Sequence, residues 1–234
     1  MKAMILAAGR GERLRPLTDK IPKPLLAIAG KPVIAYTIES LVKAGFYDIV
    51  INLAYLGHTI KSELGNGDRF KARLRYSDEG EVGLETAGGI IHALPLLGND
   101  PFLVVNGDIM TDYPYHRLRN VKTGSAHLVL VTNPAHHPSG DFSIRNGCLG
   151  TDADHLLTFS GIGVYSPDFF IGCPPGKSPL APLLRDAMGR GRVTGECYDG
   201  LWVDLGTIDR FKQAEQMVEQ GFFGIPGGAD SQVC

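Results

Sequence analysis

The sequence predicts an α/β fold in which helices cover both faces of a mixed, mainly parallel sheet. In the first half of the chain, short apolar runs typical of strands buried on both faces alternate with segments of helical period. Past residue 126, strand-like runs are joined by short turns, and Asn146-Gly147 is a hairpin signal. The sheet is therefore expected to be parallel at first and mixed later.

Each element follows from its local pattern of apolar residues and from the glycines that bound it. Strands are expected at 3–8, 48–53, 73–76, 102–106, 127–131, 142–144, 158–165, 193–198 and 201–205. Helices are expected at 31–44, 57–64, 87–97, 180–188 and 208–219. Because no long linker separates them, we expect one domain over 1–223, with halves at about 1–125 and 126–223, followed by a flexible glycine-rich tail at 224–234.

Composition excludes several classes of protein. With 234 residues, a net charge of −2 and a pI near 6.4, the chain has no general attraction for nucleic acid or acidic membranes. No apolar run approaches the roughly 18 residues of a membrane span, and no signal peptide is recognisable, so a cytoplasmic protein is expected. The cysteines lack the C-x-x-C spacing of a zinc site.

A glycine-rich, cationic loop follows the first strand. Gly9 and Gly11 have no Cβ, so the backbone there can approach a ligand closely and turn its N–H groups toward phosphate. Arg13 and Lys23 add positive charge. The dinucleotide fingerprint would need a third glycine where Leu14 stands, so this loop is a phosphate site of another kind.

A second glycine-rich segment resembles a P-loop but does not match it. A P-loop has a glycine five residues before its Gly-Lys-Ser, whereas Gly176-Lys177-Ser178 follows Gly172 by four, with two prolines between. We therefore interpret this segment as a coincidental match.

Two carboxylates follow strands late in their respective halves. Asp108 follows the strand at 102–106, where ligands of open α/β sheets bind, and Asp204 ends the strand at 201–205. Each could instead be a turn former or a helix cap. Beside a polyphosphate, however, a bare carboxylate would repel the substrate, so a shared Mg²⁺ is the favoured interpretation.

Two further segments carry polar groups. Residues 85–89 open a helix whose backbone N–H groups could hold a base edge or a sugar phosphate, although a softened helix start remains an alternative. His136-His137 with Asp141 suggests a metal site or a catalytic triad. That interpretation is disfavoured because no serine or cysteine elbow accompanies these residues.

The chain resembles the sugar nucleotidyltransferases over about residues 1–220. The signature G-x-G-x-R-x-x-P followed by P-K-P matches at residues 9–16 and 22–24, and W-x-D-x-G-T matches at 202–207. The resemblance implies a Rossmann-like nucleotidyltransferase fold of the glycosyltransferase-A type, with a nucleotide-binding and a sugar-binding half. It also implies an enzyme that transfers a nucleotidyl group from a nucleoside triphosphate to a sugar 1-phosphate and releases pyrophosphate.

The resemblance also implies roles for individual residues. The catalytic cations would be Arg13, at the leaving pyrophosphate, and Lys23, at the acceptor and α-phosphates. Nucleotide-binding residues would be Ala8, Gly9, Gly11, Glu12, Arg13, Lys23, Glu85, Thr86 and Gly88. Asn106, Asp141 and Ser160 would contact the sugar, and Asp108 with Asp204 would bind Mg²⁺.

Within the family, the compact members that uridylylate N-acetylmuramate α-1-phosphate in bacterial cell-wall recycling are most similar. They share the N-G-D-x-x-T-D-Y and H-H-x-x-G-D-F segments, and the Glu-Lys-Pro segment of larger hexose-1-phosphate enzymes is missing. UTP is therefore the expected donor, and the protein is expected to be a monomer or weak homodimer. Alternatives are glucose 1-phosphate, mannose 1-phosphate or phosphocholine as acceptor, or an inactive nucleotide-sugar sensor.

Overall fold

The computed structural model describes residues 1–152 and 155–223, so the predicted tail at 224–234 lies outside the described residues. The strands are β1 (Ala3–Leu6), β2 (Ala27–Ile28), β3 (Lys31–Pro32), β4 (Asp48–Leu53), β5 (Arg73–Asp78), β6 (Phe102–Asn106), β7 (Ile109–Thr111), β8 (Ala126–Val131), β9 (Ser143–Arg145), β10 (Cys148–Gly150), β11 (Thr158–Tyr165), β12 (Val193–Tyr198) and β13 (Trp202–Asp204). The α-helices are α1 (Val33–Lys43), α2 (Gly57–Leu64), α3 (Glu85–Leu97), α4 (Leu180–Gly189) and α5 (Ile208–Glu219).

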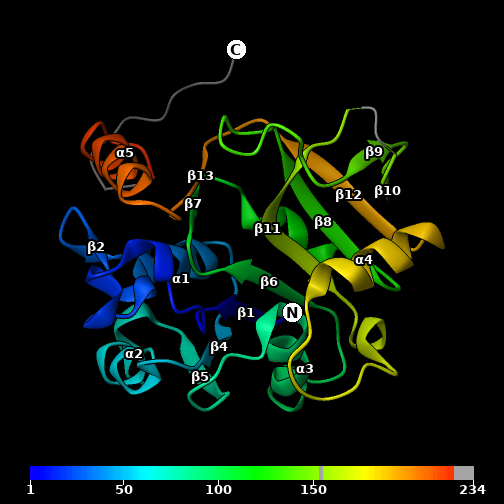
Figure 1. Ribbon diagram of the computed structural model, residues 1–234. Helices are drawn as coiled ribbons and strands as arrows, with labels where there is room; N and C mark the ends of the chain where they lie inside the picture. The colour runs from blue at the N-terminus through cyan, green and yellow to red at the C-terminus, as the bar shows by residue number, and fades with distance from the viewer. Residues whose placement is uncertain (153–154, 224–234) are drawn as a thin grey trace.

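A nine-stranded sheet runs through the molecule in the order β5-β4-β1-β6-β11-β8-β12-β10-β9 (Figure 1). The four strands β5, β4, β1 and β6 are parallel. The strand β11 is antiparallel to both β6 and β8, and β12 is parallel to β8. Strands from both halves of the sequence therefore belong to one mixed sheet.

Helices cover both faces of this sheet, as the apolar patterns predict. On one face, α1 and α2 pack on the sheet through Ile34, Ile38, Leu41, Ile60 and Leu64. On the other face, α3 and α4 pack through Ala87, Ile90, Ala93, Leu97, Leu180 and Leu184. Burial of these side chains stabilises the fold by about 25 cal/mol for each Å² of apolar surface removed from water.

A small two-stranded ribbon lies apart from the main sheet. The strands β7 and β13 pair antiparallel, with Asp204 opposite Ile109, and the Leu205 amide donates to the Asp108 carbonyl oxygen over 2.8 Å. The helix α5 packs beside the ribbon in a third apolar cluster that includes Val203 and Ala214. The ribbon thus holds the backbones of Asp108 and Leu205 together, although they are far apart in the sequence.

The predicted elements match the observed ones closely, and the mixed α/β fold is confirmed. The predicted hairpin joins β9 to β10, and Asn146 and Gly147 have the positive φ values, 52° and 75°, that a tight hairpin turn uses. The sequence reasoning missed the short strands β2, β3, β7 and β10, and it assigned the residues of β3 to the helix that follows. Within the described residues, no helix has both the length and the apolarity needed to cross a membrane.

Candidate active site

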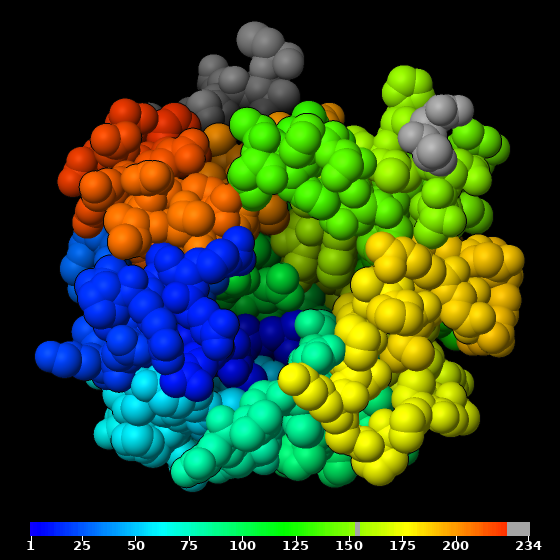
Figure 2. Space-filling model, viewed as in Figure 1, coloured from blue at the N-terminus to red at the C-terminus, as the bar shows by residue number. Residues whose placement is uncertain are grey.

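The carboxyl ends of β1 and β6 border a cavity of about 520 Å³. Leu6 lies opposite Asn106 in parallel register, and the Gly107 amide donates to the Leu6 carbonyl oxygen over 2.9 Å. A Cβ on residue 107 would lie 2.6 Å from that oxygen, so only glycine fits here. Figure 2 shows the molecule hollowed in this region, between the blue N-terminal segment and the teal and yellow segments. This is the sheet edge at which ligands of open α/β folds bind.

The cavity brings together eight of the residues that the sequence predicted to bind substrate or metal. These are Ala8, Gly9, Glu12, Lys23, Glu85, Thr86, Asn106 and Asp108. The predicted residues that do not border it are Gly11, Arg13, Gly88, Asp141, Ser160 and Asp204.

The glycine loop is shaped by its two glycines in different ways. Gly9 has nothing within 4 Å of where a Cβ would lie, so its backbone is open to a ligand. Gly11 has a φ of 67°, and a Cβ there would lie 3.0 Å from Thr18 Cγ2 and 3.1 Å from Lys23 Cβ. Gly11 therefore lets the loop fold tightly against the stem of Lys23 and does not itself border the cavity.

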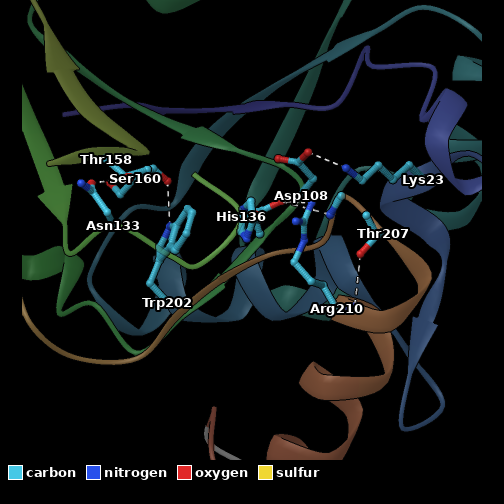
Figure 3. Close-up of polar contacts among 11 residues, drawn as sticks. Lys23, Asp108, Asn133, His136, Thr158, Ser160, Trp202, Thr207 and Arg210 are labelled. Carbon is cyan, nitrogen blue, oxygen red and sulfur yellow. Dashed lines mark hydrogen bonds and ion pairs between the residues drawn. The ribbon is translucent and has the colours of Figure 1, made fainter. Parts of the chain in front are cut away.

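Lys23 and Asp108, which both border the cavity, form an ion pair. The Lys23 Nζ lies 2.5 Å from Asp108 Oδ2, and the two side chains point toward each other in Figure 3. The Lys23 side chain is 10% exposed, whereas that of Asp108 is 38% exposed. A buried ammonium is thus held by a carboxylate that solvent can still reach.

Asp204 lies among two arginines and a histidine at the end of β13. Its Oδ1 is 2.7 Å from Arg210 Nη2, and its Oδ2 is 2.7 Å from His136 Nε2. The Arg13 guanidinium reaches the same turn, because a Cβ on Gly206 would lie 3.1 Å from Arg13 Nη2. Arg13 therefore lies beside Asp204 and not in the glycine loop's cavity, which differs from its predicted position.

Asp108 and Asp204 offer carboxylate oxygens of the kind that magnesium prefers. Asp204 Oδ2 is buried and accepts no hydrogen bond of good geometry, although His136 lies at contact distance. The described residues contain no cluster of three or more His, Cys, Asp or Glu side chains that could enclose a metal alone. Mg²⁺ is usually held by one or two carboxylates together with phosphate oxygens and water, so it does not require such a cluster.

His136 is a contact of Asp204 that sequence reasoning did not find. The loop 134–141 carries it to the ribbon, while the neighbouring His137 approaches Asp141 Oδ1 to 3.1 Å. The two adjacent histidines thus contact different carboxylates, His136 that of Asp204 and His137 that of Asp141. The signal in the sequence was the His-His-x-x-Gly-Asp segment itself, but the contact with Asp204 is formed only by the fold.

The predicted sugar ligands lie in different environments. Asn106 borders the cavity and packs directly over Gly161, where a Cβ would lie 2.5 Å from Asn106 Nδ2. Both oxygens of Asp141 already have partners: His137 at Oδ1 and the Phe159 amide, 2.9 Å away, at Oδ2. Asn106 is thus the predicted sugar ligand with direct access to the cavity.

Ser160 lies inside a β-bulge and cannot present its hydroxyl to a sugar, contrary to the expectation. The register of β11 shifts between Phe159 and Ile162, and Ser160 is 1% exposed. Its hydroxyl donates to the Val129 carbonyl oxygen and accepts from the Ile162 amide. The Trp202 indole N–H donates to the Ser160 carbonyl oxygen over 2.9 Å, so the bulge fixes the ribbon to the main sheet (Figure 3).

The start of α3 is occupied by a loop from the other half of the chain, which corrects the prediction for Gly88. The amides of Ala87 and Gly88 donate to the Ser178 carbonyl oxygen over 3.0 and 3.1 Å. A Cβ on Gly88 would lie 2.2 Å from the Gly176 carbonyl oxygen. Gly88 thus lets two backbones approach and has no free N–H for a nucleotide.

Lys177 is a further cavity residue that sequence reasoning missed. It belongs to the Gly-Lys-Ser segment set aside as coincidental, and it borders the cavity with its Nζ 3.7 Å from Glu85 Oε1. Lys177 therefore brings a cation from the second half of the chain to the cavity. Its neighbour Glu85 has a φ of 61°, an uncommon conformation for a residue with a side chain.

The fold is that of an α/β protein with a cavity at the carboxyl edge of its parallel strands, the edge at which such folds bind ligands. Comparison with known proteins identifies the family within this broad class of α/β proteins. The family model described as nucleotidyl transferase matches residues 2–143. The chain belongs to this nucleotidyl transferase family and is a transferase.

Several relatives are similar over most of their length. The chain is 50% identical over 226 residues to an N-acetylmuramate alpha-1-phosphate uridylyltransferase from Neisseria meningitidis serogroup B, covering 93% of this chain and 98% of that protein. It is 33% identical to the protein of the same name from Caulobacter vibrioides, covering 87% and 91%. A mannose-1-phosphate guanylyltransferase catalytic subunit beta from Xenopus tropicalis is 29% identical, covering 88% and 61%.

Solved structures share the fold. A Bacillus anthracis protein described as a glucose-1-phosphate thymidylyltransferase, crystallised with sucrose, superposes with a TM-score of 0.83 at 24% identity, covering 98% of both chains. HddC from Yersinia pseudotuberculosis, complexed with GMP-PN, has a TM-score of 0.77 at 21% identity, covering 93% of this chain and 99% of that one.

Proposed function

We propose that the protein transfers a uridylyl group from UTP to N-acetylmuramate α-1-phosphate, giving UDP-N-acetylmuramate and pyrophosphate. The names of the relatives at 50% and 33% identity, both similar over nearly their whole length, support this choice of substrates. The observation that carries the chemistry is the pairing of a buried ammonium with a solvent-accessible carboxylate, Lys23 with Asp108, beside the open glycine loop.

The reaction requires two polyanions to meet. A phosphate oxygen of the sugar 1-phosphate attacks the α-phosphorus in line, the bond to the bridging oxygen breaks, and pyrophosphate leaves with its electron pair. No covalent enzyme intermediate is needed, so the protein acts by positioning groups and neutralising charge. Lys23 would hold the attacking and α-phosphate oxygens together, and Arg13 would neutralise charge near Asp204.

A divalent ion, which enzymes of this family generally use, is proposed to be Mg²⁺ held by Asp108 and Asp204. When bound, it would neutralise phosphate charge and orient the phosphates for attack. In this proposal Lys23 leaves Asp108 when substrate and metal enter, and its ammonium turns to phosphate. Arg210 and His136 keep the Asp204 carboxylate in place.

The remaining residues are assigned by their place in the cavity. Ala8, Glu85 and Thr86 are proposed to border the nucleoside, and Gly9 with Glu12 the phosphates. For the sugar we retain Asn106, which borders the cavity, and Asp141, which would have to exchange one of its present partners for a sugar hydroxyl. We also propose that the protein is located in the cytoplasm, acts in peptidoglycan recycling and is a monomer or a weak homodimer.

A pyrophosphate-release assay tests this function directly. Purified protein is given each of the four nucleoside triphosphates with N-acetylmuramate, glucose or mannose 1-phosphate, or with phosphocholine, with and without excess chelator. We expect UTP with the muramyl compound to exceed every other pair by about 10²-fold or more in kcat/KM, because polar groups left unpaired discriminate strongly. Equal turnover of glucose 1-phosphate or mannose 1-phosphate would refute the acceptor, and full activity in chelator would refute the metal.

A further inference from the structure

Arg10 lies in the glycine loop and is stacked on an aromatic ring that also borders the cavity. Its guanidinium carbon is 4.8 Å from the centroid of the Tyr55 ring. The Tyr55 hydroxyl donates to the Asp19 carbonyl oxygen over 3.1 Å, so the chain that follows the glycine loop fixes the ring. The arginine is therefore supported from a position outside its own segment.

Arg10 differs from neighbouring cations in what neutralises it. Lys23 is paired with Asp108, and Lys177 lies 3.7 Å from a Glu85 oxygen. Within residues 1–152 and 155–223, Arg10 has no carboxylate oxygen within 4.0 Å and is held by the ring alone. Stacking on an aromatic face leaves the N–H groups at the edge of a guanidinium free for hydrogen bonds, and their planar fork fits phosphate.

The cavity is bordered by carboxylates as well as by cations. The carboxylates are those of Glu12, Glu79, Glu81, Glu85 and Asp108. A polyphosphate among these carboxylates needs cations that offset the repulsion between like charges. Since Lys23 is at Asp108, where the α-phosphate must react, Arg10 is the cavity cation that remains for the phosphates beyond it.

From this arrangement we propose that Arg10, preorganised on Tyr55, binds the terminal phosphates of the nucleotide and makes the site select a triphosphate. This inference rests on the proposed function, because it assumes a nucleoside triphosphate in this cavity. It assigns Arg10 a role distinct from that of Arg13, whose guanidinium lies beside Gly206 and does not border the cavity. The two arginines contact different regions of the site.

Calorimetric titrations with UTP, UMP and pyrophosphate, each with Mg²⁺, test the assignment. Arg10→Ala should weaken UTP and pyrophosphate binding by about 10- to 100-fold, the range for losing hydrogen bonds to a charged group, and leave UMP within about twofold. Lys20→Ala removes the same charge from an exposed position in the same segment and should change none of these affinities.

Variants of the ring test its part in the mechanism. Tyr55→Phe keeps the stacking surface and should bind UTP within about twofold of the wild type, since cation–π attraction needs only the ring face. Tyr55→Leu removes that surface and should weaken UTP and pyrophosphate by about threefold or more while sparing UMP. Thermal melts of all variants show whether each remains folded, which is expected because Arg10 is on the surface.

The outcomes separate this inference from the proposed function. If Arg10→Ala bound UTP and pyrophosphate as well as the wild type, or lost UMP equally, the inference would be wrong while the proposed function stood. If the wild type bound pyrophosphate through Arg10 but bound no uridine nucleotide, the phosphate assignment would stand and the UTP proposal would fail. Binding of neither ligand to the folded wild type would overturn both.

Discussion

Replacing Lys23 by methionine should have opposite effects on metal binding and on catalysis. In the free protein the Lys23 ammonium is 2.5 Å from the Asp108 carboxylate that we assign to the metal. A cation entering the site must therefore displace another cation. Lys23→Met keeps a side chain of similar length, removes the charge and leaves Asp108 free, so the variant should bind a divalent ion more tightly than the wild type.

The size of this effect follows from the geometry. Two unit charges 2.5 Å apart attract by about 7 kcal/mol at an effective dielectric constant of about 20, which is an upper bound. Asp108 is 38% exposed, so water recovers most of that energy when the pair separates. We take about 1–2 kcal/mol as the net cost of breaking the pair, which corresponds to about 5- to 30-fold tighter binding in the variant.

The assay is a Mn²⁺ titration of nucleotide-free protein by calorimetry, run beside steady-state kinetics. Lys23→Met should lower kcat/KM by at least about 10²-fold, because a preorganised group that neutralises transferring phosphate is lost. Lys20→Met is the matched control, since it removes the same charge nearby without touching the pair. Unchanged or weaker Mn²⁺ binding in Lys23→Met would refute the proposed competition between lysine and metal at Asp108.

Three further predictions follow from packing and burial. Gly206→Ala would place a Cβ 2.2 Å from Nη2 of Arg210, the arginine that contacts Asp204. The variant should remain folded but lose at least about 10-fold in kcat/KM, and unchanged kinetics would contradict this. Gly88→Ala would clash with a backbone carbonyl and should lower the free energy of unfolding in urea by about 1–3 kcal/mol, whereas Gly189→Ala, which has open space, should change it by less than about 0.5 kcal/mol. Burial lowers the pKa of His127, so the unfolded chain binds this proton more readily than the folded protein as the pH falls below about 6.5. The protein should therefore lose stability toward pH 5. The urea midpoint of the wild type should fall over this range, and that of His127→Gln should fall less.

Features built from neighbouring residues were the ones that sequence reasoning found. The glycine loop and the lysine that follows it are close in sequence, so their chemistry can be recognised without a fold. Asp108 follows an apolar strand, and the rule that ligands gather at strand ends placed it at the cavity. The alternation of apolar runs sufficed for the sheet because burial on two faces leaves a continuous apolar signal.

Features that depend on contacts between distant segments could not be predicted. Ser160 is read as a small polar residue near the sugar, but a bulge in β11 turns its hydroxyl inward. The helix start at Gly88 has the composition of an anion site, but the carbonyl of Ser178 occupies its amides. Lys177 reaches Glu85 because a loop from the second half folds back over the first, and His136 reaches Asp204 because the fold joins two distant segments of the second half.

The ribbon of β7 and β13 joins two segments that are far apart in the sequence. Both carboxylates assigned to the metal are attached to it, and its hydrogen bonds to itself set how far apart their backbones lie. The ribbon is joined to the main sheet by apolar packing of Ile109 and by the hydrogen bond from Trp202 to the bulge. The spacing of these two backbones is therefore set by strand pairing and not by the loops that border the cavity.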